Sequence, residues 1–246
     1  MSDQASTIMV NTLEPQSGTT LTVGKSGQNL QVNADSLKAN VAKDAGGNAV
    51  FTSDGSGNIS GLNSGFGSAE VLITTTTVST AVSEIEFTSG ITSTYKEYVF
   101  KLHNIAPETE TGLRFAVSTD GGSSYGIDKT TTAWHQYNNA AADHWGPGYD
   151  AGRDLPPNGT NPAPISGNLG NSADQAYIGE IHLFNPAGTT YVKNYYMEMQ
   201  MYNNNNYAWH GFFAGYVNST GDIDAIKFTM ASGNITAGTI KMYGIK

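Results

Sequence analysis

The sequence predicts an all-β protein whose main part is an antiparallel β-sandwich of jelly-roll type. From Glu70 onward, apolar and polar residues alternate with a period of two, as they do in half-buried strands. In Tyr95–Asn104, for example, Tyr98 and Phe100 occupy one face and Lys101 occupies the other. Only 13% of the residues are charged, whereas glycine alone contributes 29 residues. The polar surface must therefore come mostly from Thr, Ser, Asn and Gly, which favour strands and turns over helices.

The beginning of the chain has a different pattern and is predicted to form a separate amino-terminal arm. The arm covers residues 1–66 and the sandwich covers 67–246, with the boundary in the Gly- and Ser-rich stretch Gly61–Ser68. Apolar alternations in the arm are only about three or four residues long, and turn sequences such as Asp54–Asn58 separate them. A weak helix is expected at Ala34–Ala42.

Strands as short as those of the arm cannot bury an apolar face within one chain. We therefore expect copies of the chain to complete them, most simply as a homotrimer whose arm docks onto a larger assembly. An arm that lies across a neighbouring domain is the alternative. The apolar residues expected to carry docking and oligomerisation are Leu21, Val23, Leu30, Val32, Val50 and Phe51.

About nine or ten strands are expected in the sandwich, and turn residues separate them. The clearest runs are Val71–Val78, Val82–Phe87, Tyr95–Asn104, Leu113–Val117, Ile178–Phe184, Tyr191–Tyr202, Trp209–Val217, Ile223–Met230 and Thr239–Tyr243. The stretch Asn138–Gln175 interrupts this rhythm and is rich in Gly, Pro, Asn and Ala. Long loops without regular structure in compact domains are usually functional or mobile. We expect this one to be held in place by a neighbouring subunit.

Composition argues against several classes of function. The net charge of −9, with only 12 basic residues, disfavours binding to nucleic-acid backbones. The absence of cysteine excludes disulfides and thiolate metal sites. Met1–Val10 lacks the basic and apolar regions of a signal peptide, and no window approaches the ~20 apolar residues of a membrane span. We therefore expect no nucleic-acid partner and no membrane insertion.

No catalytic, cofactor-binding or metal-binding residue is predicted. The five histidines form neither an HxH nor an HExxH pair. Asp54–Asn58 and Asp120–Ser124 resemble fragments of calcium loops, but turn chemistry explains them better. Glu180 and Glu198 are candidates for an acid–base pair, for which an ordinary solvent-facing sheet surface is the favoured alternative. The chain is therefore predicted not to be an enzyme.

Aromatic residues gather around the ends of the long loop and beside the run Asn203–Asn206. Aromatic rings next to Asn and Asp side chains suit a surface that stacks on sugar rings and binds their hydroxyl groups. The residues considered for glycan binding are Trp145, Tyr149 and Trp209. The alternative is that these rings fill the core or a subunit interface, where Trp and Tyr are enriched.

Five stretches of the chain have a distinctive sequence: Asn11–Asn40, Asp44–Gly61, Thr94–Glu110, Ile181–Tyr196 and Ser232–Lys246. Through these stretches the chain resembles structural proteins of marine tailed bacteriophages, including cyanophages. The resemblance implies a virion protein of the tail-fibre, tail or capsid-decoration type, assembled in the host cytoplasm and exposed on the particle surface. It also implies contacts with other virion structural proteins and a role in host attachment, and it transfers no catalytic residue.

Overall fold

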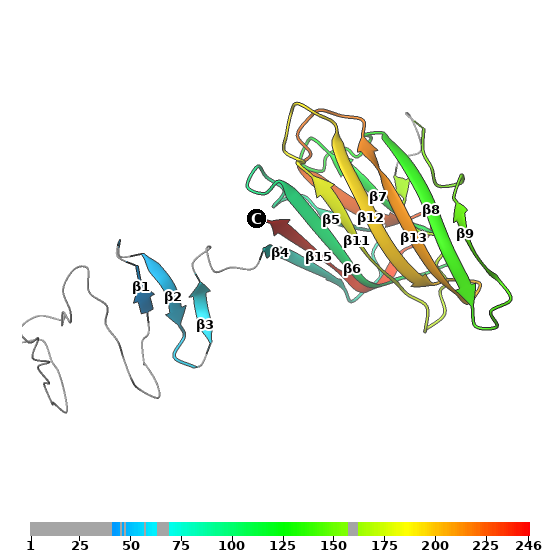
Figure 1. Ribbon diagram of the computed structural model, residues 1–246, viewed down its shortest axis with the longest axis horizontal. Helices are drawn as coiled ribbons and strands as arrows, with labels where there is room; N and C mark the ends of the chain where they lie inside the picture. The colour runs from blue at the N-terminus through cyan, green and yellow to red at the C-terminus, as the bar shows by residue number, and fades with distance from the viewer. Residues whose placement is uncertain (1–40, 45, 47, 57, 63–68, 157–161) are drawn as a thin grey trace, which may run out of the picture. The chain divides into compact units, whose positions relative to one another are not determined.

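The computed structural model describes residues 41–62 except 45, 47 and 57, together with residues 69–156 and 162–246. The chain divides into two compact units, Met1–Phe66 and Gly67–Lys246. Every regular element among the described residues is a strand, and the strands pair antiparallel in several sheets (Figure 1). The predicted all-β antiparallel sandwich is confirmed, whereas its jelly-roll topology stays a prediction.

The amino-terminal unit contains a three-stranded sheet in the order β1 (Val41–Lys43), β2 (Ala49–Ser53) and β3 (Ile59–Leu62). In each of the two loops that join these strands, an aspartate side chain accepts hydrogen bonds from backbone amides of the same loop. Oδ1 of Asp44 accepts hydrogen bonds from the backbone amides of Gly46 and Asn48 at 2.8 and 2.9 Å. Oδ1 of Asp54 accepts the equivalent bonds from Ser56 and Asn58 at 2.7 and 3.1 Å. These local bonds hold two hairpins of the same kind. The side-chain amide of Asn58 donates to Oδ2 of Asp54 at 2.8 Å, and this bond, together with the backbone bonds, lowers the pKa of Asp54.

The docking residues predicted in this unit are only partly within the described residues. Val50 and Phe51 lie on β2 and are half-buried, whereas Leu21, Val23, Leu30 and Val32 lie outside the described part of the chain. The last two residues of the expected helix, Val41 and Ala42, lie in β1, so the helix prediction is wrong there. A β-branched residue beside a tight hairpin favours the extended conformation.

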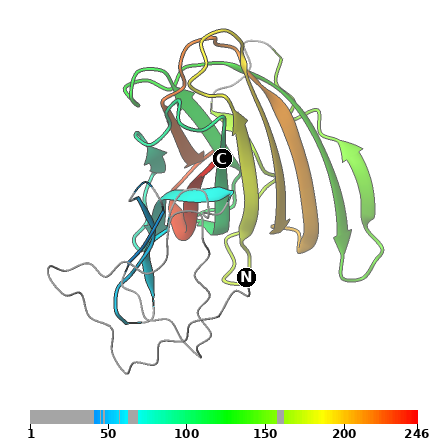
Figure 2. The same ribbon diagram turned by 60° about the vertical axis from the view of Figure 1, so that its left-hand side comes forward.

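The carboxy-terminal unit contains an eight-stranded and a four-stranded sheet. The order of the larger sheet is β4 (Glu70–Val78), β15 (Ile235–Ile245), β6 (Glu97–Pro107), β11 (Tyr177–Phe184), β12 (Lys193–Tyr202), β13 (Tyr207–Val217), β8 (Lys129–Asn139) and β9 (Trp145–Tyr149). The order of the smaller sheet is β10 (Ala163–Pro164), β7 (Leu113–Ser118), β14 (Ala225–Met230) and β5 (Glu84–Phe87). Figure 2 shows the long strands of the larger sheet side by side, with β8 and β9 in green at one edge.

The core lies between the two sheets. On β12, Tyr195, Met197 and Met199 are buried, whereas the residues between them face outward. Aromatic contacts join the two layers: the ring centroids of Phe115 and Tyr195 are 5.1 Å apart. Burial of large apolar side chains at each second position is what stabilises this packing. We call the core side of the eight-stranded sheet its inner face and the solvent side its outer face.

The long stretch Asn138–Gln175 is not the structureless loop that the sequence predicts. Strand β9 lies within it and pairs with β8, and β10 pairs with β7. Leu155, Ile165 and Leu169 of the same stretch are buried in the core. Gly and Pro are poor strand formers, but an edge strand tolerates them because one side needs no partner. The described parts of the stretch therefore pair and pack within their own chain, and the expectation that a subunit neighbour also holds it stays a prediction.

Two lysines are buried at one end of the inner face. Lys129 on β8 and Lys193 on β12 both lie opposite Val217, so they flank it on neighbouring strands. Nζ of Lys129 donates to the carbonyl of Ile127 at 3.2 Å and lies 5.0 Å above the ring of Phe115. Burial lowers the pKa of Lys129 to about 7 and also lowers that of Lys193.

The buried lysine makes stability depend on pH. Because the pKa of Lys129 falls from 10.5 to about 7 on folding, the unfolded chain binds more protons between these pH values. The free energy of unfolding should therefore rise with pH across this range. Lys129→Met should reduce that rise in urea unfolding series, whereas the exposed Lys43→Met control should leave it unchanged. A Lys129→Met variant that keeps the full slope would contradict the assignment.

Candidate functional site

The outer face of the eight-stranded sheet carries one row of charged and aromatic side chains. The strand register places them directly opposite one another on six neighbouring strands, where facing side chains are about 5 Å apart. The members of this central row are Lys101 on β6, Glu180 on β11, Glu198 on β12, Phe212 on β13, Trp134 on β8 and Tyr149 on β9.

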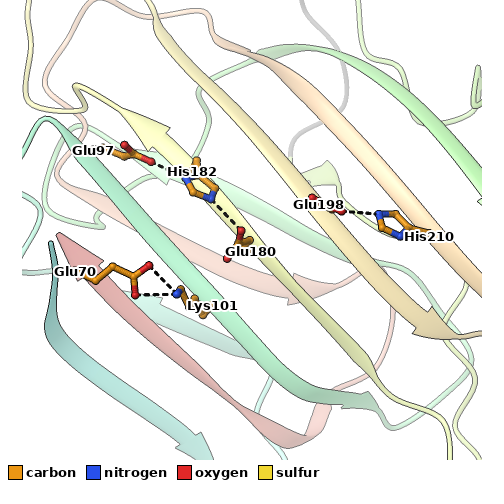
Figure 3. Close-up of polar contacts among 7 residues, drawn as sticks. All are labelled: Glu70, Glu97, Lys101, Glu180, His182, Glu198 and His210. Atoms are coloured by element: carbon orange, nitrogen blue, oxygen red, sulfur yellow. Dashed lines mark hydrogen bonds and ion pairs between the residues drawn. The ribbon is translucent and has the colours of Figure 1, made fainter. Parts of the chain in front are cut away.

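Two like charges face each other in the middle of this row. Glu180 and Glu198 are direct cross-strand partners, an arrangement that is destabilising unless opposite charge lies nearby. A histidine nitrogen lies beside each carboxylate: Nε2 of His182 is 3.2 Å from Oε1 of Glu180, and Nε2 of His210 is 3.0 Å from Oε1 of Glu198 (Figure 3). Nδ1 of His182 lies 2.6 Å from Oε1 of Glu97. His182 therefore bridges two carboxylates, and its protonated form donates to both.

A lysine ends the row on β6. Nζ of Lys101 donates to both carboxylate oxygens of Glu70 at 2.8 Å (Figure 3). The hydrogen bond with Glu70 raises the pKa of Lys101, and the negative charge of Glu180 adds to this effect. The ammonium group of Lys101 therefore interacts mainly with Glu70 on β4, which lies in the strand order away from Glu198 on β12.

Two hollows lie along the row, each of about 330 Å³. The first, which we call the acidic hollow, is lined by polar side chains that include Lys101, His103, Glu180, Glu198, Gln200 and His210. The second, which we call the aromatic hollow, is lined by Thr132, Trp134, Tyr196, Glu198, Phe212 and Ala214, among others. Glu198 lines both hollows and separates them.

Small residues create the aromatic hollow. In the row next to the central one, Tyr196 on β12 faces Ala214 on β13, which in turn faces Thr132 on β8. The short side chains leave space between the ring of Tyr196 and the rings of Phe212 and Trp134. The exposed fractions of Trp134 and Tyr196 are 47% and 44%, so both rings remain open to solvent.

Ring stacking stiffens the walls of the aromatic hollow. The rings of Trp134 and Phe212 are nearly parallel with centroids 4.6 Å apart, and Tyr196 stacks on His182 at 4.4 Å. Partial burial raises the pKa of Tyr196, and the negative charges of Glu97, Glu180 and Glu198 raise it further. The hollow therefore combines apolar ring surfaces with negative potential.

The three residues considered for glycan binding do not share one surface. Trp145 is 71% exposed and lies with Tyr149 on the outward side of the edge strand β9. Trp209 is only 6% exposed, and its ring stacks on His135 at 5.1 Å on the inner face. The strand register explains why the two tryptophans lie on opposite faces. Trp145 lies opposite Asn138, whereas Trp209 lies opposite Tyr137, and adjacent residues of a strand point to opposite faces.

Other features of the chain bear on its chemistry. Within the described residues, no group of three or more His, Cys, Asp or Glu side chains could hold a metal ion. In the same part of the chain, no helix has the length and apolar character needed to span a membrane. Comparisons with protein-family models, with curated proteins and with solved structures find no match.

Proposed function

We propose that this chain is a non-enzymatic structural protein of a tailed-bacteriophage particle, which assembles as a homotrimer through residues 1–66 and acts through protein–protein contacts. One observation carries the proposal. Among the residues of the amino-terminal unit whose burial is described, none is buried, and the apolar side chains of Val41 and Ile59 are exposed. A sheet whose described side chains are all at least partly exposed gains stability when another copy or another protein covers it.

The strands of this unit favour association for a second reason. They are three, five and four residues long, and the outer strands β1 and β3 present edges that pair with no described strand. Open edges of this kind pair readily with other chains. A closed, symmetric assembly removes them, which supports the trimer and the docking role inferred from the resemblance to virion proteins.

The outer face of the sandwich supports binding better than acid–base catalysis. A catalytic acid of a glycosidase sits in a pocket that excludes water. The side chains of Glu180 and Glu198 are 43% and 51% exposed, and His182 and His210 lie against them. Such carboxylates suit hydrogen bonds and ion pairs with a bound partner.

Removal of the arm tests the structural role. Full-length protein should sediment as a trimer and enter particles, whereas a chain that begins at Gly67 should sediment as a monomer and fail to enter them. In the full chain, Phe51→Asp should weaken the trimer because it replaces a half-buried apolar side chain, one of those expected to carry oligomerisation, with a charge, and Lys43→Asp serves as the exposed control. A monomeric full-length protein, or incorporation without the arm, would contradict the proposal.

A host-surface carbohydrate-binding module on the virion is a second candidate function. The exposed rings of Trp145 and Tyr149 on β9 favour it, because such rings stack on sugars. A glycan array should then bind the wild-type protein, and Trp145→Ala should lose most of the signal. Absence of binding by both proteins would exclude this site.

A further inference from the structure

We propose that the aromatic hollow binds a quaternary ammonium group, such as the trimethylammonium headgroup of choline. The inference goes beyond the proposed structural role and does not depend on the arm, because every residue that carries it lies in the sandwich unit. Three aromatic side chains and one carboxylate line this hollow: Trp134, Tyr196 and Phe212 supply the rings and Glu198 supplies the charge.

The shape of the hollow suits a compact, apolar cation. Trp134 and Phe212 form one wall, in which their rings stack at 4.6 Å with an interplanar angle of 16°. Because His210 also stacks on Phe212, at 4.5 Å, the open aromatic surface of this wall comes from Trp134, which is 47% exposed. Tyr196 rises on the other side, and Ala214 lies between the two walls in the strand register. Cations are attracted to aromatic faces by the ring quadrupole, and quaternary ammonium ligands are recognised by sets of such rings.

Charge also favours a cation. Glu198 lies at the rim of the hollow. Partial burial raises the pKa of Tyr196, and the negative charges of Glu97, Glu180 and Glu198 raise it further. The nearest lysine of the central row, Lys101, is bound to Glu70.

Other ligand classes fit less well. A divalent cation requires several oxygen ligands, and Glu198 is the single carboxylate that lines this hollow. A primary ammonium group is compact and strongly hydrated, so it loses more hydration on entering an apolar space. A sugar needs several polar partners, whereas Thr132 and Glu198 are the main polar side chains at the walls. A trimethylammonium group requires neither several oxygen ligands nor several polar partners, and it is less strongly hydrated than a primary ammonium group.

A titration of the full-length protein with choline tests the inference. Choline should bind saturably in calorimetry and shift the NMR signals of Trp134. Its uncharged isostere 3,3-dimethyl-1-butanol should bind at least about tenfold more weakly, which corresponds to a cation–π and ionic contribution of this size. Equal affinity for the two ligands, or no saturable binding of choline, would overturn the proposal.

Matched variants locate the site. Trp134→Leu and Glu198→Gln should each weaken choline binding about tenfold, since one removes a wall and the other removes the rim charge. Trp145→Leu removes an exposed tryptophan on β9 outside the hollow and should bind choline as the wild type does. Circular dichroism confirms that each variant is folded. Loss of binding in Trp145→Leu, or wild-type affinity in both site variants, would place the ligand elsewhere and overturn the proposal. The sedimentation result for the arm is independent of all these outcomes.

Discussion

The two-residue period of the strands in the eight-stranded sheet is the constraint on which the rest of the sandwich depends. Burial of Tyr195, Met197 and Met199 against the four-stranded sheet requires Tyr196 and Glu198 to point the other way. A slip of one residue would exchange the two faces and bring a carboxylate into the core, at a cost of several kcal/mol. Apolar packing on the inner face therefore selects the register, and the register assembles the polar and aromatic row on the outer face.

The charges and the sizes of the side chains in and beside the central row determine the properties of the outer face. Glu180 and Glu198 face each other directly, the positive charge of Lys101 interacts with Glu180, and a histidine nitrogen lies beside each carboxylate. The small Ala214 leaves a space that the rings beside it do not fill. A surface with exposed rings and partly exposed carboxylates is suited to contacts with ligands or partners, and the amino-terminal unit is suited to contacts with other chains.

Nearly all of the strands that alternate clearly could be predicted from the sequence, and the same alternation places Glu180 and Glu198 on a polar face. Strand β8 could not be predicted as readily, because its inward positions include Thr131 and His135 and its periodicity is weak. Strand β9 contains Gly-Pro-Gly, which is typical of a loop. Packing between the sheets determines which distant strands pair with each other. The sequence does not show this pairing, so the central row could not be predicted from it. Trp209 and Trp145 are both tryptophans in aromatic-rich parts of the sequence, so the sequence alone does not distinguish them. The strand register places Trp209 in the core and leaves Trp145 exposed.

Cysteine scanning along β12 tests the alternation of faces most directly, because the chain contains no cysteine of its own. Single cysteines would be introduced at each position from Tyr196 to Gln200, and their rates of reaction with a small thiol reagent would be measured under native conditions. We expect fast modification at Tyr196, Glu198 and Gln200, and strong protection at Met197 and Met199. Uniform reactivity along the strand, or protection at the outward positions instead, would contradict the register and the outer-face site built on it.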